Sequence, residues 1–421
     1  MSQANTISSF GALLKEYYTD EVVQDETFTD NPALALLPKN EMVTGKHYNV
    51  PVIYSQGQGR SNNFANAQTR GAVTGTNSAV FQVALLDNWA DATISSDLIL
   101  SSGNDRGAFL KAATQVTDGQ LKNLALDIEV SLFGDGSGTR GQVANTVYSG
   151  TDITLTNPKD ALKFEVGMVL VAYSTLTGST LTVPHIGTAG YVAVAKVDRI
   201  AGKLTMACTT LADATDGFGA SFATGDYLVC LGDVNSKILG FPAWIPYGGP
   251  TAGDSFTSSG VDRTVDPVRL AGLYMNGTGM STEECLIKAT AAVSEQGDHL
   301  THLLMNYSKF AAFCSSLSSK VQITNLKASE AVGFQSLEIM GASGPVKIVP
   351  CRSCPSTTIM GLNMNYWELV SVRKAVFVWD LDGRPSLRQG TDSGLEMRFM
   401  SYSNLVCHKP SANINILVNA A

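Results

Sequence analysis

The chain has 421 residues, of which 44% are hydrophobic and only 16% are charged, and its formal net charge is −8. This length and composition exclude intrinsic disorder and predict about two or three domains with sizeable cores. Proteins that bind nucleic acid tightly carry a basic surface patch, so the negative net charge argues against tight DNA binding. A negatively charged container is still compatible with enclosing DNA, because it repels the phosphates.

The sequence also limits the compartment and the fold class. Its first residues lack the features of a signal peptide, and no apolar stretch has the length of a membrane span. Seven cysteines at irregular spacing predict free thiols and folding in a reducing cytoplasm. Thirty-nine Gly beside abundant Ser and Thr indicate many turns and short strands, and the class we predict is α+β.

The N-terminal part combines a short amphipathic helix, predicted over residues 7–18, with an apolar run at 31–38 that prolines bracket. Proline removes a backbone donor and disfavours helix in the residue before it. Leu34, Leu36 and Leu37 would therefore be exposed and need a neighbouring surface. We predict that the run is an arm that docks on another chain.

Two strand-like runs follow, at 48–53 and 80–86. The segment between them, 55–79, is rich in Gly, Asn, Gln, Ser and Thr, and its only charged residues are Arg60 and Arg70. A polar segment between two strands predicts an extended hairpin that leaves the domain body.

After a further apolar run at 93–100, residues 105–133 predict a long helix, with Asn104 as N-cap and Gly134 as its stop. At 1.5 Å per residue this helix is roughly 40 Å long. Its apolar residues recur at steps of three and four, so one face is expected to be buried. These residues are Phe109, Ala113, Val116, Leu124, Ile128 and Leu132.

Residues 141–235 have a different composition, rich in Thr and Gly, with short alternating runs and no helical period. The runs lie at 168–173, 191–197, 204–208 and 227–231. This pattern predicts a small β-barrel or sandwich inserted between two parts of the main fold.

The last part of the chain alternates between helix and strand signals. Ser281 and Glu284 form a capping box that opens a helix ending near Ser294. A strand at 302–305 leads into a helix at 309–317. Further strands are predicted at 337–340, 346–349, 359–362, 375–379, 395–401 and 414–418.

Several residues could carry chemistry, and the first set is the glycine-rich run at 134–138. Phosphate cradles follow a strand, open a helix and usually end in Lys, whereas this run follows a helix. A flexible turn is the preferred interpretation.

Cys351 and Cys354 have the spacing of half a zinc site or of a redox pair, and Cys407 with His408 could complete a site. One spacing match among seven cysteines is a weak signal. Buried thiols that pack like small apolar residues are the preferred interpretation.

Asp298, His299 and His302 could form part of a metal site, but residues three apart on a strand face opposite sides. Asp380 and Asp382 match only part of a calcium loop and lack its downstream Glu. No Gly-x-Ser-x-Gly elbow occurs in the sequence. We therefore predict no catalytic, cofactor-binding or metal-binding residue.

The order of these elements resembles that of major capsid proteins of tailed bacteriophages of the Hong-Kong-97 type. The resemblance runs essentially end to end and rests on short phrases in a shared order. These are YYTD at 17–20, NPALALLPKN at 31–40, GRS at 59–61, GDGSG at 134–138, FEVGM at 164–168, PAWIP at 242–246, GVDRTVDPVRLAG at 260–272 and WDLDG at 379–383.

The resemblance implies the following division of the chain. Residues 1–47 are an N-terminal arm, 48–87 the E-loop hairpin, 88–140 the P domain with its spine helix, 141–238 an inserted β domain, 239–375 the A domain, and 376–421 returning strands of the P domain.

It also implies a structural function in the virion. It implies that subunits form hexamers and pentamers of an icosahedral shell that encloses double-stranded DNA, assembled in the host bacterial cytoplasm with a portal protein; a decoration protein is a further candidate partner. Because the hairpin begins within about fifty residues of Met1, we expect a separate scaffolding protein. The predicted inter-subunit contacts are Leu34, Leu36, Leu37, Gln58, Arg60, Phe64 and Arg70.

Two other classes of protein compete with this interpretation. Another β-rich virion protein, such as a tail component or a glycan-binding module, would make the Thr-rich insertion central but leaves the long helix and the uncharged hairpin unexplained. A metal- or thiol-dependent enzyme would depend on Cys351, Cys354 and His299.

Overall fold

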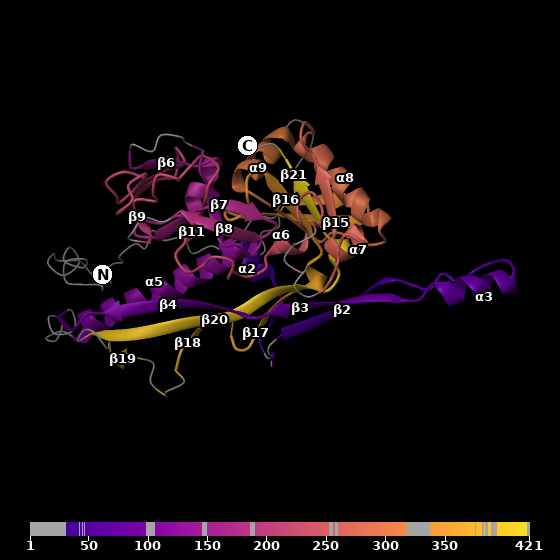
Figure 1. The fold of residues 1–421 in the computed structure, drawn as a ribbon, viewed down its shortest axis with the longest axis horizontal. Helices are drawn as coiled ribbons and strands as arrows, with labels where there is room; N and C mark the ends of the chain where they lie inside the picture. Colours follow the sequence, from indigo (N-terminus) through magenta and orange to yellow (C-terminus); the bar gives the residue numbers. More distant parts are fainter. Residues whose placement is uncertain are drawn as a thin grey trace.

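The computed structural model describes residues 31–41, 43, 45, 47–97, 106–144, 150–185, 190–251, 256, 260–317, 337–374, 376–380, 383, 386–388 and 394–418. The helix predicted at 7–18 lies outside these residues. Figure 1 shows an elongated molecule in which a long hairpin leaves the body at one end and a long helix lies along a long sheet. Two further units, one rich in strands and one mixed, sit on the same side of that sheet.

The long sheet is built around strand β20 (Leu395–Cys407), whose two edges pair with different partners. One edge pairs with β4, and the other pairs in turn with β17, β18 and β19. Strand β1 adds to β17 in parallel. The bounds are β1 (Lys39–Asn40), β4 (Leu86–Ile94), β17 (Trp367–Ser371), β18 (Phe377–Val378) and β19 (Leu387–Arg388).

Helix α5 (Arg106–Leu132) packs on one face of this sheet and confirms the predicted spine helix to within a residue at each end. Its 27 residues make it about 40 Å long. Leu124, Ile128 and Leu132 are buried, as their spacing predicts. Gly119 lies inside the continuous helix with open space around it.

Strand β4 lies between the predicted strand-like run at 80–86 and the apolar run at 93–100, and it includes residues of both. The first run ends at Ala84, and β4 continues without a break through Asp87 and Asp91. Strand prediction relies on large apolar residues at every second position. In the middle of β4 the residues that face the helix are small, and they alternate with acidic residues, so this pattern is absent.

The predicted hairpin consists of β2 (His47–Ser55) and β3 (Asn77–Ala84), which pair antiparallel from His47 opposite Ala84 outward. Between them lies a helix, α3 (Phe64–Val73), which the extended-hairpin prediction missed. The side chain of Asn63 caps this helix by accepting the Ala65 N–H at 2.9 Å. The hairpin therefore ends in a structured tip, residues 56–76.

The apolar run at 31–38 was predicted to be an extended arm, and this prediction is wrong in its local structure. Helix α2 (Pro32–Leu36) begins at a proline, which is tolerated in the first turn because its missing N–H needs no partner there. The Leu34 N–H donates to the Glu129 carboxylate at 2.8 Å. Leu34 and Leu37 are 9% and 3% exposed, so the surface that covers them is the chain's own core.

The insertion is an antiparallel sheet in the order β5-β11-β7-β9-β10-β6, with β8 paired to β7. Its own core includes Phe164, Leu170, Phe218 and Phe222. Each predicted run contains a strand. The bounds are β5 (Thr139–Gln142), β6 (Asp152–Thr154), η1 (Pro158–Lys163), β7 (Val169–Thr177), β8 (Thr180–His185), β9 (Val192–Asp198), β10 (Lys203–Met206) and β11 (Tyr227–Cys230).

The third unit is a six-stranded mixed sheet in the order β12-β21-β16-β13-β15-β14. Its strands are β12 (Leu273–Asn276), β13 (His302–Met305), β14 (Leu337–Gly341), β15 (Gly344–Pro350), β16 (Thr358–Leu362) and β21 (Ile414–Leu417). Its helices are α6 (Phe241–Trp244), α7 (Pro267–Ala271), α8 (Thr282–Glu295), α9 (Tyr307–Leu317), η3 (Met364–Tyr366) and η4 (Pro410–Ala412).

The N-terminus of α8 confirms the first half of the predicted capping box, in which Ser281 accepts a bond from the helix backbone. Ser281 Oγ accepts the Glu284 N–H at 3.2 Å. The Glu284 carboxylate pairs with Lys288 at 2.7 Å, one helical turn further on. Within the described part of the chain, no helix is both long and apolar enough to cross a membrane.

We predict that a fragment spanning 139–238 folds alone, because its core draws on residues of the insertion only. The isolated fragment should give a β-type circular dichroism spectrum and melt cooperatively. A random-coil spectrum would contradict the interpretation of this unit as an independent domain.

Candidate functional site

The base of the hairpin is anchored in the main core. Phe81 on β3 packs edge-to-face against Trp244 and Phe256, with ring centroids 5.4 and 5.2 Å away. The Trp244 indole N–H donates to the Leu405 carbonyl of β20 at 3.0 Å. This aromatic cluster holds β3 against the central strand of the long sheet, so the hairpin leaves the body in a fixed direction (Figure 1).

The tip of the hairpin is held together by hydrogen bonds between its side chains and its backbone. The Gln58 N–H donates to Thr74 Oγ1 at 2.8 Å, and the Arg70 guanidinium donates to the Arg60 carbonyl at 3.0 Å. Helix α3 lies so close to the incoming chain that a Cβ on Gly59 would stand 3.1 Å from the Gly71 Cα. Glycine at both positions lets the two backbones meet.

The outside of the tip is apolar and uncovered. Phe64 is 83% exposed and Val73 is 80% exposed. Both lie on α3, none of whose residues is buried. An isolated two-stranded ribbon is marginally stable in water, so a long one with exposed apolar residues at its end is typical of a segment that binds another surface.

Four of the seven predicted inter-subunit contact residues lie on this tip and are exposed, namely Gln58, Arg60, Phe64 and Arg70. The other three do not join them. Leu34 and Leu37 are buried within the chain, and Leu36 packs half-buried against the same core. The structure thus removes Leu34 and Leu37 from the candidate contact surface, and the role of the tip residues remains a prediction.

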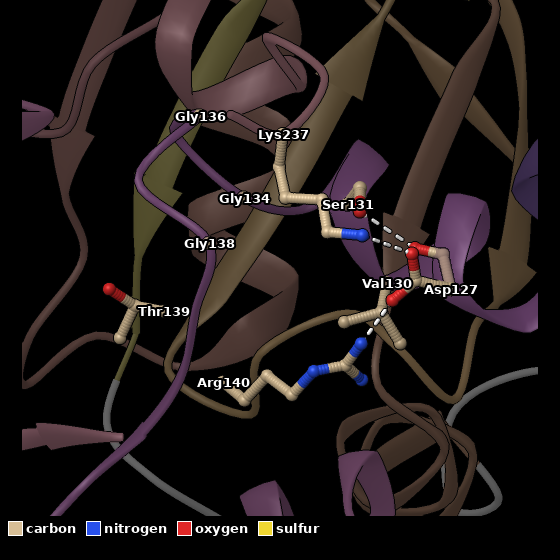
Figure 2. Close-up of a pocket in the computed structure, with 9 residues that line it drawn as sticks. All are labelled: Asp127, Val130, Ser131, Gly134, Gly136, Gly138, Thr139, Arg140 and Lys237. Atoms are coloured by element: carbon tan, nitrogen blue, oxygen red, sulfur yellow. Dashed lines mark hydrogen bonds and ion pairs between the residues drawn. The ribbon is translucent and has the colours of Figure 1, made fainter. Parts of the chain in front are cut away.

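A cluster of buried charges joins the spine helix to the insertion (Figure 2). Asp127 on α5 accepts from Lys237 Nζ at 2.5 Å and from Asn88 Nδ2 of β4 at 2.6 Å, and it also pairs with the Arg140 guanidinium. Lys237 reaches Asp233 as well, at 3.2 Å. Arg140 lies where the chain enters the insertion, and Lys237 lies where the chain leaves it. The Asp127 carboxylate therefore binds both of the segments that connect the insertion to the main fold.

The charges in this cluster balance one another. Burial alone would raise the pKa of Asp127, but the positive charges of Arg140 and Lys237 and their hydrogen bonds outweigh burial and hold that pKa below its ordinary value. For Asp233, burial dominates and raises the pKa of the carboxyl group. Because the two cations are already neutralised, they are not available for an anionic ligand.

The glycine-rich run at 134–138 forms the turn between the spine helix and the insertion, as predicted. Gly136 and Gly138 adopt φ values of +93° and +83°, and a Cβ on Gly138 would stand 2.4 Å from the Asp233 carbonyl oxygen. The turn lines one side of a small cavity beside Asp127 (Figure 2). These glycines are therefore explained by the tight turn between the helix and the insertion, and phosphate binding is not needed to explain them.

The cysteines singled out in the sequence are structural. Cys351, Cys354 and Cys407 are fully buried, as predicted for thiols that pack like small apolar residues. Burial raises the pKa of Cys354 to about 12, and the pKa of Cys407 is also raised. Both thiols therefore stay protonated, and His408 is engaged with Glu368 at 3.2 Å.

The other metal candidates have local partners. Asp298 pairs with Lys409 at 2.5 Å, His302 Nδ1 bonds to its neighbour Thr301 at 3.0 Å, and the His299 ring is half exposed. The Asp380 backbone carbonyl closes a turn by accepting the Gly383 N–H at 2.7 Å, and the Asp380 carboxylate lies 3.6 Å from the Arg373 guanidinium. Asp382 lies outside the described residues. Across the described residues, no three His, Cys, Asp or Glu side chains are placed to hold a metal ion.

Sequence reasoning missed the charged cluster, and it also missed an aromatic pair formed by Trp89 and Trp379. Asp127 occupies a position on a helix where a polar residue is ordinary. In the sequence, Asp127 is a polar residue that lies between the buried residues Leu124 and Ile128 of the predicted helix. This position does not reveal that its partners lie in distant parts of the chain.

Neither a protein-family model nor a curated protein matches the sequence. Solved structures do match. The chain is similar to one from the Cyanophage A-1(L) capsid asymmetric unit, with 12% identity over 98% of this chain and 99% of that one and a TM-score of 0.53. Two further similarities have lower TM-scores. A chain from the capsid of a native GTA particle has 8% identity over 100% of each chain and a TM-score of 0.48. A chain of the holo-SrpI encapsulin complex of Synechococcus elongatus PCC 7942 has 9% identity over 99% of this chain and 96% of that one and a TM-score of 0.46.

The chain therefore has the Hong-Kong-97-type capsid fold, in agreement with the resemblance drawn from its sequence. This is a fold of shell-forming proteins, and it is mixed α+β. The similarity covers nearly the whole of both chains.

We predict that Asp127→Asn lowers the free energy of unfolding of the purified subunit by about 3 kcal/mol, because two buried cations lose their main counter-ion. Chemical denaturation measures this. The control is Asp152→Asn, which breaks an exposed pair with Lys203 and should cost under ~1 kcal/mol.

The pH dependence follows from the lowered pKa of Asp127. A carboxylate with a lowered folded-state pKa stabilises the fold above its unfolded pKa and loses this contribution as the pH falls through the folded value. The difference between wild type and Asp127→Asn should therefore shrink below about pH 4. A difference that stays constant down to acid pH would contradict the ion-pair account.

Proposed function

We propose that this chain is the major capsid protein of a tailed bacteriophage, which assembles in many copies into the icosahedral head that encloses the double-stranded DNA genome. The observation that carries the proposal is the fold, which is similar end to end to a chain of a phage capsid asymmetric unit. No described group of residues calls for catalysis, and the elements that stand out are those suited to contact other subunits.

The hairpin is the clearest of these elements. Its base is fixed by Phe81 in the aromatic cluster, whereas its tip projects beyond the body with Phe64 and Val73 in solvent. Exposed apolar side chains at the end of a projecting hairpin are suited to contact a neighbouring subunit. Many such weak contacts, repeated around a closed shell, give stability that no single interface supplies.

The partners that we propose follow from this function. Copies of the chain form hexamers and pentamers, a separate scaffolding protein guides their assembly in the host bacterial cytoplasm, and a portal protein occupies one vertex. A decoration protein is a further candidate. The net charge of −8 suits a wall that encloses DNA without binding it tightly. A tail component or glycan-binding module is not retained, because neither gives the spine helix and hairpin a role.

The proposal is tested by electron microscopy of the expressed chain, with and without its scaffolding partner. We expect icosahedral shells from the wild-type chain, and particles from infected cells should contain double-stranded DNA. Shells that enclose protein cargo and no genome would contradict the phage assignment while leaving the shell-forming function intact.

Shortening the hairpin between Gly57 and Gly75 should leave a folded, soluble subunit that builds no stable shell, because helix α3 contributes no buried side chain to the core. Gel filtration and microscopy of the shortened variant measure both properties. Normal shells would show that the tip is not an assembly element, and an insoluble product would show that it belongs to the core.

We also predict that the mature shell contains no covalent links between subunits through the hairpin. The sequence has no Lys between His47 and Leu110, and the two cations of the tip, Arg60 and Arg70, are guanidinium groups that remain protonated and cannot act as amine nucleophiles. Mature particles boiled in detergent and reductant should release one band near 44.5 kDa. A ladder of multimers that survives this treatment would contradict the prediction.

A further inference from the structure

A buried histidine lies between two segments of the insertion that are separate in the sequence. His185 is the last residue of β8, and it is 7% exposed. Its Nδ1 atom lies 2.8 Å from Ser221 Oγ, and its Nε2 atom lies 3.4 Å from the carboxylate of Asp226, which is 3% exposed. We call His185, Ser221 and Asp226 the histidine cluster. It connects the end of β8 to the loop that precedes β11.

The Nε2 side of the imidazole is unsatisfied. This atom is buried, and within the described part of the chain it makes no hydrogen bond, although Asp226 Oδ2 is close. Asp226 Oδ2 accepts the Ala223 N–H at 2.7 Å. A neutral imidazole carries a hydrogen on one ring nitrogen, whereas an imidazolium carries one on each. Protonation would therefore let His185 donate to Ser221 and to Asp226 at the same time.

The segments around His185 bring no other formal charge to it. Residues 169–185, which include β7 and β8, contain no Asp, Glu, Lys or Arg. The same holds for the loop at 218–225. Asp226 is therefore the charged residue that these segments place beside His185.

The other titratable side chains of the adjacent strands point away or stay neutral. In the register of β7 and β8, His185 lies opposite Ala172, so Tyr173 points to the other face of the sheet. Tyr227 of β11 pairs with Tyr173 and shares that other face. Cys230 lies on the face of His185 but at the far end of β11, and burial raises the pKa of its thiol. The cluster therefore titrates through His185 and Asp226.

The pKa of Asp226 gives the sign of the pH dependence. Burial raises this pKa above the ordinary carboxyl value, and the Ala223 N–H and the charge of His185 lower it only in part. A group with a raised folded-state pKa stabilises the fold at low pH and loses this contribution as the pH rises through the folded value. The window opens above the unfolded carboxyl value of about 4, and imidazoles change charge between about pH 5 and 8. Acidification should therefore strengthen the cluster.

The end of β8 is held in a strained conformation. Val183 has a φ of +59°, which β-branched residues rarely adopt. Such conformations persist where the surrounding contacts hold them in place. The loop on the other side of the cluster is anchored, because Phe218 and Phe222 are stacked in the core of the insertion with ring centroids 4.8 Å apart. The histidine cluster thus ties a strained strand end to an anchored loop.

We propose that the histidine cluster is a pH-sensitive lock, in which protonation of His185 ties the end of β8 to the loop at 218–226 and deprotonation releases it. In the protonated state His185 donates to Ser221 Oγ and pairs with Asp226. In the neutral state the Asp226 carboxylate is buried without a counter-ion, so the contact opens more often. The lock lies within the insertion and does not depend on the proposed shell-forming function.

Hydrogen exchange of the purified full-length chain at about pH 5.5 and about pH 8 tests the lock, after correction for the intrinsic effect of pH on amide exchange. Peptides that cover 180–185 and 218–230 should open about tenfold less often at the lower pH, the factor that corresponds to one pK unit. Peptides that cover β9 and β10 are the internal reference and should change by less than about twofold. An equal change throughout the insertion, or no change, would overturn the proposal.

Two substitutions identify the groups responsible. Asp226→Asn keeps the shape of the side chain and an oxygen that can accept the Ala223 N–H, but it removes the charge. His185→Gln removes the group that takes up the proton. Each variant should lose the pH dependence of the two peptides, and because they change different partners, either one decides the question if the other does not fold.

The matched control is Asp198→Asn, which removes an exposed carboxylate of the same unit that accepts the Ile200 N–H at 3.0 Å. This variant should keep the pH dependence of the wild-type chain. A pH dependence that persists in Asp226→Asn or in His185→Gln would show that other groups titrate and would overturn the proposal.

Discussion

The carboxylate of Asp127 is the constraint on which the arrangement of the main units depends. It lies on the spine helix, and it binds Asn88 of the long sheet together with Arg140 and Lys237 at the two crossings of the insertion. Removing such charges from water is costly, and the cost is offset only when every partner is in place. The cluster therefore favours one orientation of the insertion over others that apolar packing alone would allow.

The main core and the exposed hairpin tip are separate parts of the structure. The aromatic cluster around Phe81 and Trp244 fixes the root of the hairpin, and it belongs to the same core as the long helix and the long sheet. The hairpin tip takes no part in this core, and its apolar side chains Phe64 and Val73 are exposed. Exposed apolar groups that recur in every copy of the chain suit the closed shell that we propose.

Local sequence signals predicted much of this fold. The spine helix, the two strands of the hairpin, four of the seven strands of the insertion and the Ser281 cap follow from periodicity or capping, which depend on neighbours in the chain. The predictions that were wrong concern residues whose environment is distant. Helix α2 forms because Glu129, almost a hundred residues away, accepts its backbone N–H groups. Leu34 and Leu37 are buried by the same contact with the spine helix, so they are not a free docking surface.

The sequence by itself determined the order of the units and the absence of any amine on the hairpin, because element type follows from local periodicity and composition follows from counting. Only the tertiary structure decided which polar residues are buried together and which aromatic residues remain outside. Asp127 meets Lys237 across 110 positions of chain, and Trp89 meets Trp379 across nearly three hundred. Such pairings depend on how sheets and helices pack in space, and no local pattern of residues encodes them.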